Sequence, residues 1–389
     1  MEWCKGNGGA IGETDARVCN FRNLCYSNFY KMFLLDKPVL VKHVVHLATV
    51  IGAGIGNMLS YYEIPMDNPV LKNHLYINYK RGNYAMFSRI PTNNIAHDIH
   101  DVLIPLFYTL ESEEFNKRPS HTLIFWFEDL QIESATELYN LFSRDPPITD
   151  LQISFQPKET LTCFENVTVG LLTKSIWYQW GFLLEPEGPV RKANVTSQHI
   201  RKFTEYVKKH LRLAPRCTEN VYGILFSRKI NRKILNEKEL ASAIAENFHT
   251  KVVELSMESD TLPYIIETIS CAKFALGIHG AMLILAMFLP PSSILLEMYP
   301  FGINPDHLTP YKTMAFLPGM NIEYVAWQNM NSSMSFFSKN SVRKIPRESL
   351  AEMKFRLYHD TIVNISEVLG ILRTTSLVAS SPEYPSKDL

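Results

Sequence analysis

Two histidines and two aspartates stand close together in the stretch "IAHDIHDVLIPLFYTL", residues 95–110. On a helix, side chains three and four positions apart share a face, so His97, His100 and Asp101 are predicted to converge. Such a cluster could bind a metal ion, or it could act as an acid and a base. It could equally fix the start of a packed helix, and the spacing alone does not decide among these roles.

A second candidate site lies in "FALGIHGAMLILAMFLP", residues 274–290. The pattern predicts a strand that ends at Gly277, a tight turn at His279 and Gly280, and a helix that begins at Ala281. Glycine would let a ligand approach the backbone, and the free N–H groups of a first helical turn attract phosphate. A packing turn with a core histidine is the alternative interpretation.

Arginines precede this turn in "LFSRKINRKILNEKEL", residues 225–240. Ser227, Arg228 and Arg232 follow the first strand of the same predicted sheet, at the edge where His279 also lies. The arginine fork suits phosphate oxygens, although exposed loops often carry arginines for solubility alone. Together with the turn, these residues predict a diphosphate site.

A later strand and its loop supply polar candidates. Glu297 ends the strand "SILLE", and a carboxylate in that place can accept hydrogen bonds from both hydroxyls of a ribose. The loop continues through Asn304, Asp306 and His307, which are further candidate ligand contacts. A surface carboxylate on an irregular loop fits the same spacing equally well.

The elements that position these residues form a regular pattern after residue 220. Apolar runs of strand length alternate with helical stretches, which predicts a parallel sheet covered by helices. Asn236, with Glu239 three residues later, resembles a capping box at the start of one helix. The predicted strands are 220–227, 251–255, 273–277, 293–297 and 322–327, with helices from Asn236, near Leu262 and after His279.

The first half of the chain is less regular. Its predicted strands are 74–80, 122–127 and 167–172, and its predicted helices are 97–111, 134–143 and 197–211. Breaks rich in Pro and Gly or in polar residues fall at 185–190 and 213–220. The sequence therefore predicts an α/β protein of two domains with a cleft between them. The predicted parts are 1–214, 215–346, and a C-terminal part, 347–389, in which a helix packs back across the cleft and a disordered tail follows.

Composition argues against several classes of protein. Lys plus Arg and Asp plus Glu each number 39, so no basic excess points to nucleic acid. The stretches 43–59 and 275–296 are interrupted by histidines, glycines, an asparagine or prolines, so neither predicts a membrane span. The glycines of "VIGAGIGNML", residues 50–59, give GxGxG rather than GxGxxG, which disfavours a dinucleotide-dependent oxidoreductase.

The six cysteines form no close CxxC pair, which disfavours a zinc site of the usual spacing. Cys4, Cys19 and Cys25 cluster in an N-terminal segment with little core of its own, where a disulfide would stabilise most. Sequons begin at Asn166, Asn194, Asn331 and Asn364. Sequons and an even number of cysteines favour the secretory pathway, and the start lacks signal-peptide features, so we expect a mature domain without its leader.

In the same order along the chain, several segments resemble those of the inverting glycosyltransferases of family 61. The resemblance covers roughly residues 1–370, and it is the combination of segments that is specific. These segments are "VCNFRNLCYSN" (18–28), "HDIHDVLIPLFYTL" (97–110), "WYQWGF" (177–182), "LFSRKINRKILNEKEL", "HGAMLILAMFLP" and "NPDHLTPYKTMAFLPGMNIEYVAWQNM" (304–330).

The resemblance implies a GT-B fold, in which two Rossmann-like domains face each other across a cleft. Residues 1–214 would be the acceptor side and 215–346 the donor side. It implies transfer of GlcNAc from UDP-GlcNAc to O-linked mannose on a glycoprotein of the α-dystroglycan type, giving a β-1,4 linkage in the lumen of the endoplasmic reticulum. No metal or other cofactor is expected, because arginines and a helix N-terminus can hold the diphosphate. Membrane attachment is expected only through a segment absent from this chain.

The resemblance also implies roles for individual residues. The donor-binding candidates are Ser227, Arg228, Arg232, His279, Gly280, Ala281, Glu297, Asn304, Asp306 and His307. The catalytic candidates are Arg89, Asn94, His97 and Asp101, with His97 the first candidate for the base and Asp101 or Asp98 as competitors. Three alternatives stay open: an inactive glycan-binding or scaffold protein, another O-GlcNAc or xylosyl transferase of the family, and a metalloenzyme built on His97, His100 and Asp101.

Overall fold

The computed structural model of the protein describes residues 3–5, 18–38, 41–49, 58–65, 68–89, 94–110, 119–126, 135–180, 187–191, 194–214, 217, 222–337 and 358–377. The chain divides into two compact units, Met1–Val195 and Thr196–Leu389. The helix at 197–210 therefore belongs to the second unit, whereas the boundary predicted at 214 placed it in the first. Residues 50–57, 347–357 and 378–389, which carry parts of three predictions, lie outside the described residues.

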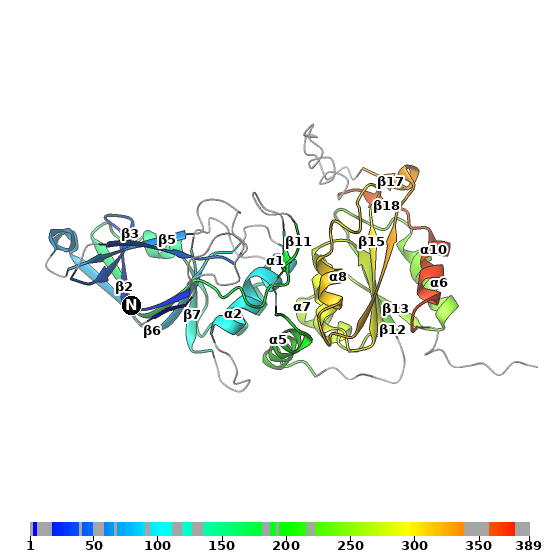
Figure 1. The fold of residues 1–389 in the computed structure, drawn as a ribbon, viewed down its shortest axis with the longest axis horizontal. Helices are drawn as coiled ribbons and strands as arrows, with labels where there is room; N and C mark the ends of the chain where they lie inside the picture. The colour runs from blue at the N-terminus through cyan, green and yellow to red at the C-terminus, as the bar shows by residue number, and fades with distance from the viewer. Residues whose placement is uncertain are drawn as a thin grey trace, which may run out of the picture. The chain divides into compact units, whose positions relative to one another are not determined.

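The first unit is built on a mixed sheet with strand order β4-β5-β3-β2-β9-β6-β7-β8, and β1 pairs with β2. β2 runs antiparallel to β3 and to β9, whereas β9, β6, β7 and β8 are mutually parallel (Figure 1). The strands are β1 (Trp3–Lys5), β2 (Val18–Ser27), β3 (Met32–Asp36), β4 (Val41–His46), β5 (Met58–Ile64), β6 (Tyr76–Phe87), β7 (His121–Phe125), β8 (Ile148–Thr149) and β9 (Thr160–Val169). β10 (Tyr178–Gln179) and β11 (Gly188–Pro189) pair separately.

Helices in this unit connect the parallel strands. They are η1 (Pro69–Asn73), α1 (Ile95–His97), η2 (Asp98–Leu103), α2 (Ile104–Thr109), α3 (Thr136–Leu141) and α4 (Asp150–Ser154). The strands before residue 65 pair largely antiparallel, and such pairing needs no crossover helix. The prediction of a simple Rossmann-like first domain is therefore wrong for this half of the sheet.

A disulfide fastens the centre of that sheet. Cys25 of β2 and Cys163 of β9 are cross-strand partners and are joined to each other. Cys19 is also disulfide-bonded, and it lies opposite Cys4 in the pairing of β1 with β2. Cys25 belongs to the N-terminal cluster that was predicted to contain a disulfide, but its partner, Cys163, lies far outside that segment.

The second unit is a doubly wound domain, as predicted. Its parallel sheet has the order β13-β12-β14-β15-β16, with α6 and α10 on one face and α7 and α8 on the other (Figure 1). The strands are β12 (Tyr222–Phe226), β13 (Lys251–Leu255), β14 (Phe274–Ile278), β15 (Ser293–Tyr299) and β16 (Ile322–Gln328), with a small pair of β17 (Ser335–Phe336) and β18 (Asp360–Thr361). The helices are α5 (Ser197–His210), α6 (Glu237–Phe248), α7 (Leu262–Ile269), η3 (Ala281–Phe288), α8 (Pro310–Ala315), η4 (Ser332–Met334) and α10 (Ile365–Arg373).

Three local predictions for this unit need correction. Asn236 precedes α6 without capping it, because its side chain exchanges two hydrogen bonds with the backbone of Val363, each of 2.9 Å. The helix after the His279 turn, η3, is a 3-10 helix and not an α-helix. The described C-terminal helix α10 buries Val368 and Leu372 in the core of its own unit, instead of packing back across a cleft.

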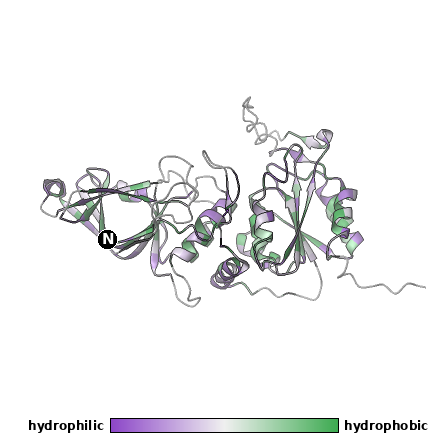
Figure 2. Ribbon diagram, in the orientation of Figure 1, coloured by the Kyte–Doolittle hydropathy of each residue, from purple (hydrophilic) through white to green (hydrophobic). Residues whose placement is uncertain are grey.

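Amphipathic helices cover this sheet. α6 and α10 carry both hydrophobic and hydrophilic residues (Figure 2), and their apolar side chains join the core formed with β12, β14 and β15. A disulfide joins Cys217 and Cys271 within this unit. Among the described residues, no helix is both long enough and apolar enough to span a bilayer.

Candidate active site

The strand order of the second unit defines where a ligand would bind. β12 and β14 are neighbours, but the chain leaves β12 toward β13 on one side and β14 toward β15 on the other. In open parallel sheets, ligands bind at the carboxyl ends of two strands whose connections diverge in this way. The segment 227–232 follows β12, and the turn 279–281 follows β14. The residues predicted to bind diphosphate therefore lie at this switch point.

Two arginines cover the turn after β14. A Cβ atom at Gly280 would lie 3.0 Å from Nη1 of Arg232 and 3.1 Å from Nη1 of Arg228, so a side chain there would require both guanidinium groups to shift. Nη1 of Arg232 donates to the carbonyl oxygen of His279 at 3.0 Å, and Arg228 donates twice to Asn231. Within the described part of the chain, neither arginine forms an ion pair, and the buried Nε of Arg232 has no hydrogen-bond partner.

The electrostatics of this pair favour an anionic ligand. Burial, and then the charge of Arg228, lower the pKa of Arg232 to about 10. Burial also lowers the pKa of Arg228. Arg232 adopts a left-handed backbone conformation, with φ of 54°, which costs roughly 1–2 kcal/mol for a residue with a side chain. A bound dianion would compensate both the desolvation and the repulsion of the two guanidinium groups.

Glu297 is not placed to bind a ribose, contrary to the prediction. Its side chain is fully buried, Oε1 accepts from Nδ1 of His279 at 2.5 Å, and Oε2 accepts from the Tyr324 hydroxyl at 2.7 Å. Burial, and then the charge of Glu297, raise the pKa of Tyr324, so the tyrosine remains a donor. The reason is that Glu297 lies within β15, between β14 and β16, and its carboxylate meets His279 from the turn after β14 and Tyr324 from β16.

The remaining donor-binding candidates have local partners. Ser227 is buried, and its hydroxyl donates to Glu237 at 3.0 Å. Ala281 begins η3 beside the arginines. Asn304 and Asp306 lie on an exposed loop, where Oδ1 of Asn304 accepts from the N–H of Asp306 at 2.9 Å. His307 is exposed on the same loop.

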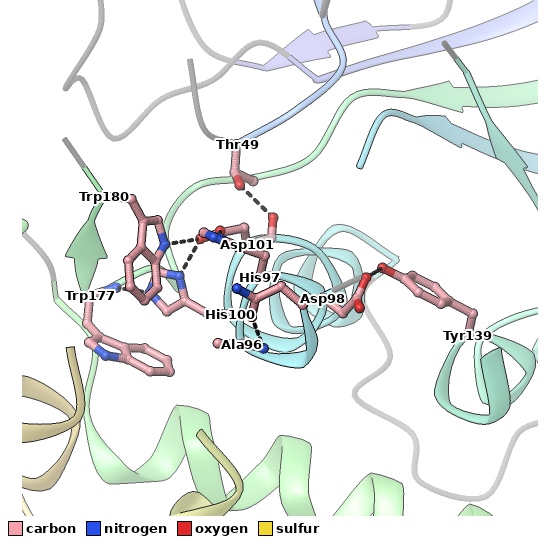
Figure 3. Close-up of polar contacts among 10 residues, drawn as sticks. Thr49, Ala96, His97, Asp98, His100, Asp101, Tyr139, Trp177 and Trp180 are labelled. Atoms are coloured by element: carbon pink, nitrogen blue, oxygen red, sulfur yellow. Dashed lines mark hydrogen bonds and ion pairs between the residues drawn. The ribbon is translucent and has the colours of Figure 1, made fainter. Parts of the chain in front are cut away.

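The cluster on residues 95–109 lies on a helix that widens in its middle. η2 is a π-helical segment between α1 and α2, and such segments often occur at functional sites. Nδ1 of His97 lies 2.6 Å from Oδ2 of Asp101, and Nδ1 of His100 bonds Oδ1 of the same carboxylate. Nε1 of Trp180 donates to that Oδ1 at 3.1 Å (Figure 3). The predicted convergence of His97, His100 and Asp101 is confirmed.

Hydrogen bonds give the two histidines different roles. Nε2 of His100 accepts from the backbone N–H of Trp177 at 3.2 Å, so its Nδ1 must carry the proton that is donated to Asp101. Both ring nitrogens of His100 thus serve the fold. His97 donates from Nδ1 to Asp101, so that in the neutral ring Nε2 carries the lone pair. A carboxylate that fixes this tautomer is the usual support of a histidine base.

The other predicted catalytic residues support the helix. Arg89 is buried above the rings of Phe125 and Tyr139, and its Nη1 lies 3.5 Å from Oδ1 of Asp98. The Tyr139 hydroxyl donates to that oxygen at 2.8 Å (Figure 3). Asn94 caps α1 by accepting from the N–H of Ala96 at 3.0 Å. Through these contacts Arg89, Asn94 and Asp98 stabilise the helix. The hydrogen bonds of the Asp101 carboxylate come instead from His97, His100 and Trp180.

These residues were also the basis of the metalloenzyme alternative. Within the described ranges, no group of three His, Cys, Asp or Glu side chains is arranged to hold a metal ion. His97 and His100 direct Nδ1 to the Asp101 carboxylate as hydrogen bonds. The metalloenzyme alternative therefore gains no support from the residues on which it was based.

The buried Asp101 carboxylate should make stability depend on pH. Burial alone would raise its pKa, but His100 and His97 outweigh burial and lower the pKa to about 2. Because the folded pKa lies below the unfolded value of about 3.8, the pairing stabilises at higher pH and is lost as pH falls toward 2. As pH falls from about 5 to about 2.5, the thermal unfolding temperature of the parent protein should drop more than that of Asp101→Asn, because the variant has no carboxylate to protonate. Parallel pH profiles for the two proteins would contradict this.

Comparisons with known proteins show which family the sequence matches. The family model described as "Glycosyltransferase 61" matches residues 95–296. A Xenopus tropicalis protein is 30% identical over 419 residues, covering 95% of this chain and 70% of the relative. Proteins of Mus musculus and Homo sapiens are each 31% identical over 402 residues, covering 92% of this chain and 67% of the relative. All three are named protein O-linked-mannose beta-1,4-N-acetylglucosaminyltransferase 2.

These matches define the class of the protein. The family match spans more than half of the chain, and the relatives match nearly all of it, so the chain belongs to glycosyltransferase family 61. Among solved structures, a dodecameric iron-containing heptosyltransferase, TibC, in complex with ADP-D-β-D-heptose covers 96% of both chains, with 12% identity and a TM-score of 0.33. That TM-score is too low to support an argument about this fold.

Proposed function

We propose that this protein is an inverting GT-B glycosyltransferase that moves GlcNAc from UDP-GlcNAc to O-linked mannose on a glycoprotein of the α-dystroglycan type, forming a β-1,4 linkage. Its family membership supports sugar transfer. The names of its relatives support the choice of sugar, acceptor and linkage. The observation that carries the proposal is the pair of half-buried arginines, Arg228 and Arg232, at the switch point of the second unit, without an ion-pair partner among the described residues.

The arginine pair would act on the donor. As the bond from the sugar C1 to the diphosphate breaks, its electron pair stays on a phosphate oxygen, and negative charge grows on the leaving UDP. Arg228 and Arg232, fixed before the reaction by Asn231 and by the His279 carbonyl, would stabilise that charge. In this proposal the two guanidinium groups neutralise the diphosphate, so transfer needs no metal ion.

The histidine of the first unit would act on the acceptor. In a single displacement the acceptor oxygen attacks C1 from the face opposite the diphosphate, which inverts the configuration. The acceptor proton passes to Nε2 of His97 while Asp101 stabilises the imidazolium through Nδ1–H. Only 8% of His97 is exposed, so the acceptor would reach one edge of the ring and water would have little access.

The disulfides support the proposed location in the lumen of the endoplasmic reticulum. The bonds Cys25–Cys163 and Cys217–Cys271 form and persist in an oxidising compartment and are rare in the cytosol. Three of the four sequon asparagines, Asn194, Asn331 and Asn364, are exposed and would be open to the glycosylation machinery of that compartment.

The function is tested with two acceptors of the same peptide sequence, one O-mannosylated and one bare. We expect calorimetry to show UDP binding, and UDP release from UDP-GlcNAc to require the mannosylated peptide. NMR of the product should show a β-1,4 bond, and transfer should survive chelation by EDTA. UDP binding without transfer would favour the inactive glycan-binding protein, and release with a different acceptor or donor would favour another transferase of the family. A protein that binds no UDP contradicts the proposal.

A further inference from the structure

A cavity of about 670 Å³ lies in the first unit, beside the strands labelled β2, β3 and β5 in Figure 1. Its lining also includes side chains of β4 and α4 and the residue after β7, Trp126. Packed cores rarely leave voids much larger than a water molecule, whereas ligand pockets measure about 300–1,000 Å³. None of the described residues that line the cavity is a candidate for donor binding or catalysis. The cavity therefore needs an explanation of its own.

Aromatic rings line the buried part of this cavity. The Tyr26 ring lies 5.0 Å from that of Phe33 and 5.1 Å from that of Trp126, and the last two are 4.7 Å apart. Each of these three side chains is buried. Tyr30 and Tyr62, which also line the cavity, are half-buried. The cavity thus presents flat apolar surface whose position is fixed before a ligand arrives.

The hydroxyl of Tyr26 lacks a partner in this setting. Only 6% of Tyr26 is exposed, and within the described part of the chain its hydroxyl makes no hydrogen bond. Burial, and then the charge of Asp150, raise the pKa of Tyr26, so the phenol stays protonated and can both donate and accept. A buried hydroxyl without a partner is costly. Because Tyr26 lines the cavity, a ligand there could supply the missing hydrogen bond.

Polar groups of both kinds surround the rings. Lys31 and Lys42 line the cavity, and neither forms an ion pair within the described ranges. Their ammonium groups donate, the carboxylate of Asp150 accepts, and the hydroxyl of Ser60 can do both. A sugar ring has the matching chemistry, since it combines a flat face of C–H groups with hydroxyls that donate and accept. A wholly apolar ligand would instead leave these polar groups desolvated.

We propose that this cavity is a glycan-binding site in which a pyranose ring packs its C–H face against the tyrosine rings and bonds its hydroxyls to Tyr26, Ser60 and Asp150. The inference goes beyond the proposed function, because it requires neither a sugar donor nor a transfer reaction. The site would bind a sugar other than the one that is modified, and so would add a second point of contact with a glycoprotein.

The test is saturation-transfer NMR without UDP-GlcNAc. The probes are the methyl glycosides of mannose, N-acetylglucosamine, galactose and glucuronic acid, and we expect the parent protein to bind at least one of them. Tyr26→Phe removes only the hydroxyl and keeps the ring that packs on Phe33 and Trp126, so it should weaken binding about 3–10-fold without unfolding. Tyr62→Ala removes a half-buried ring and should weaken binding about tenfold.

Tyr79→Phe is the matched control. It removes another tyrosine hydroxyl of the first unit, which donates to Oδ1 of Asn23 at 2.6 Å and does not line the cavity, so sugar affinity should not change. Thermal unfolding checks that each variant is folded, and Tyr26→Phe alone decides if Tyr62→Ala does not fold.

Two results would overturn the inference. One is a parent protein that binds none of the four glycosides, or binds them no better than the folded variants Tyr26→Phe and Tyr62→Ala. The other is a signal lost in His97→Ala but kept in Tyr26→Phe, which would place the sugar in the candidate active site. A protein that binds the sugar through Tyr26 yet transfers no GlcNAc would support this inference and contradict the proposed function.

Discussion

Replacing Arg232 by alanine is expected to lower turnover by about 10²–10³-fold, or roughly 3–4 kcal/mol of transition-state stabilisation, the scale found when one preorganised donor to a developing charge is removed. UDP affinity should also fall, because the same guanidinium group would bind the diphosphate before reaction. Stability should hold steady or rise, since the variant no longer buries a charge that lacks an ion-pair partner in the described structure.

Two further variants make this result specific. Arg232→Lys keeps a positive charge but loses the planar fork, so we expect it to recover part of the UDP affinity and little of the turnover. Arg373→Ala removes an exposed arginine of α10, which bonds Asn247, and should leave turnover unchanged. If Arg232→Ala turned over like the parent protein, the diphosphate would have to bind elsewhere.

The second large effect is expected at His97. His97→Ala should lower transfer by about 10²–10⁴-fold, the usual contribution of a positioned base, while UDP affinity stays within about a factor of three. Asp101→Asn should also lower transfer, because an amide cannot stabilise the imidazolium or reliably hold the Nδ1–H tautomer. Rates would be measured with saturating donor and acceptor, and UDP binding by calorimetry.

His43→Ala is the matched control for His97. His43 is also a histidine of the first unit paired with a carboxylate, Glu63, at 3.4 Å, but 31% of its side chain is exposed. We expect this control to keep its transfer rate. Normal transfer by His97→Ala would make that histidine structural, and a parallel loss of UDP binding would indicate that the variant has disturbed the fold.

The sequence predicted the second unit well because its signals are local. Each strand there is an apolar run bounded by a helix, so periodicity alone located β12 to β16. The first unit depends on pairing between distant segments. β2 mixes exposed and buried positions irregularly, and β4 is largely exposed, so neither has a pattern that identifies it as a strand. Antiparallel partners across long separations leave no local signal.

The sequence predicted which residues of the candidate site would converge better than it predicted the role of each residue. His97, His100 and Asp101 converge as expected, although the helix that carries them is π-helical in part. Glu297 was expected to contact a ribose because it ends an apolar run, whereas the buried carboxylate supports His279. Tyr324 was missed because its contact with Glu297 depends on the register of β16 beside β15, which the sequence of either strand does not specify.

The strand order of the first unit has a consequence for how the protein is made. β9 lies between β2 and β6, so the middle of the sheet cannot close until the ribosome has passed residue 169. Cys25 and Cys163 are separated by 138 residues, so Cys25 cannot form its native disulfide until that much more of the chain has been synthesised. Cys19 is synthesised shortly before Cys25. Contacts of such high contact order form slowly and leave strand edges and thiols exposed meanwhile. The first unit is therefore the part of the chain whose yield should depend on chaperones and on disulfide isomerisation during synthesis, whereas the second can assemble from neighbouring strands and helices.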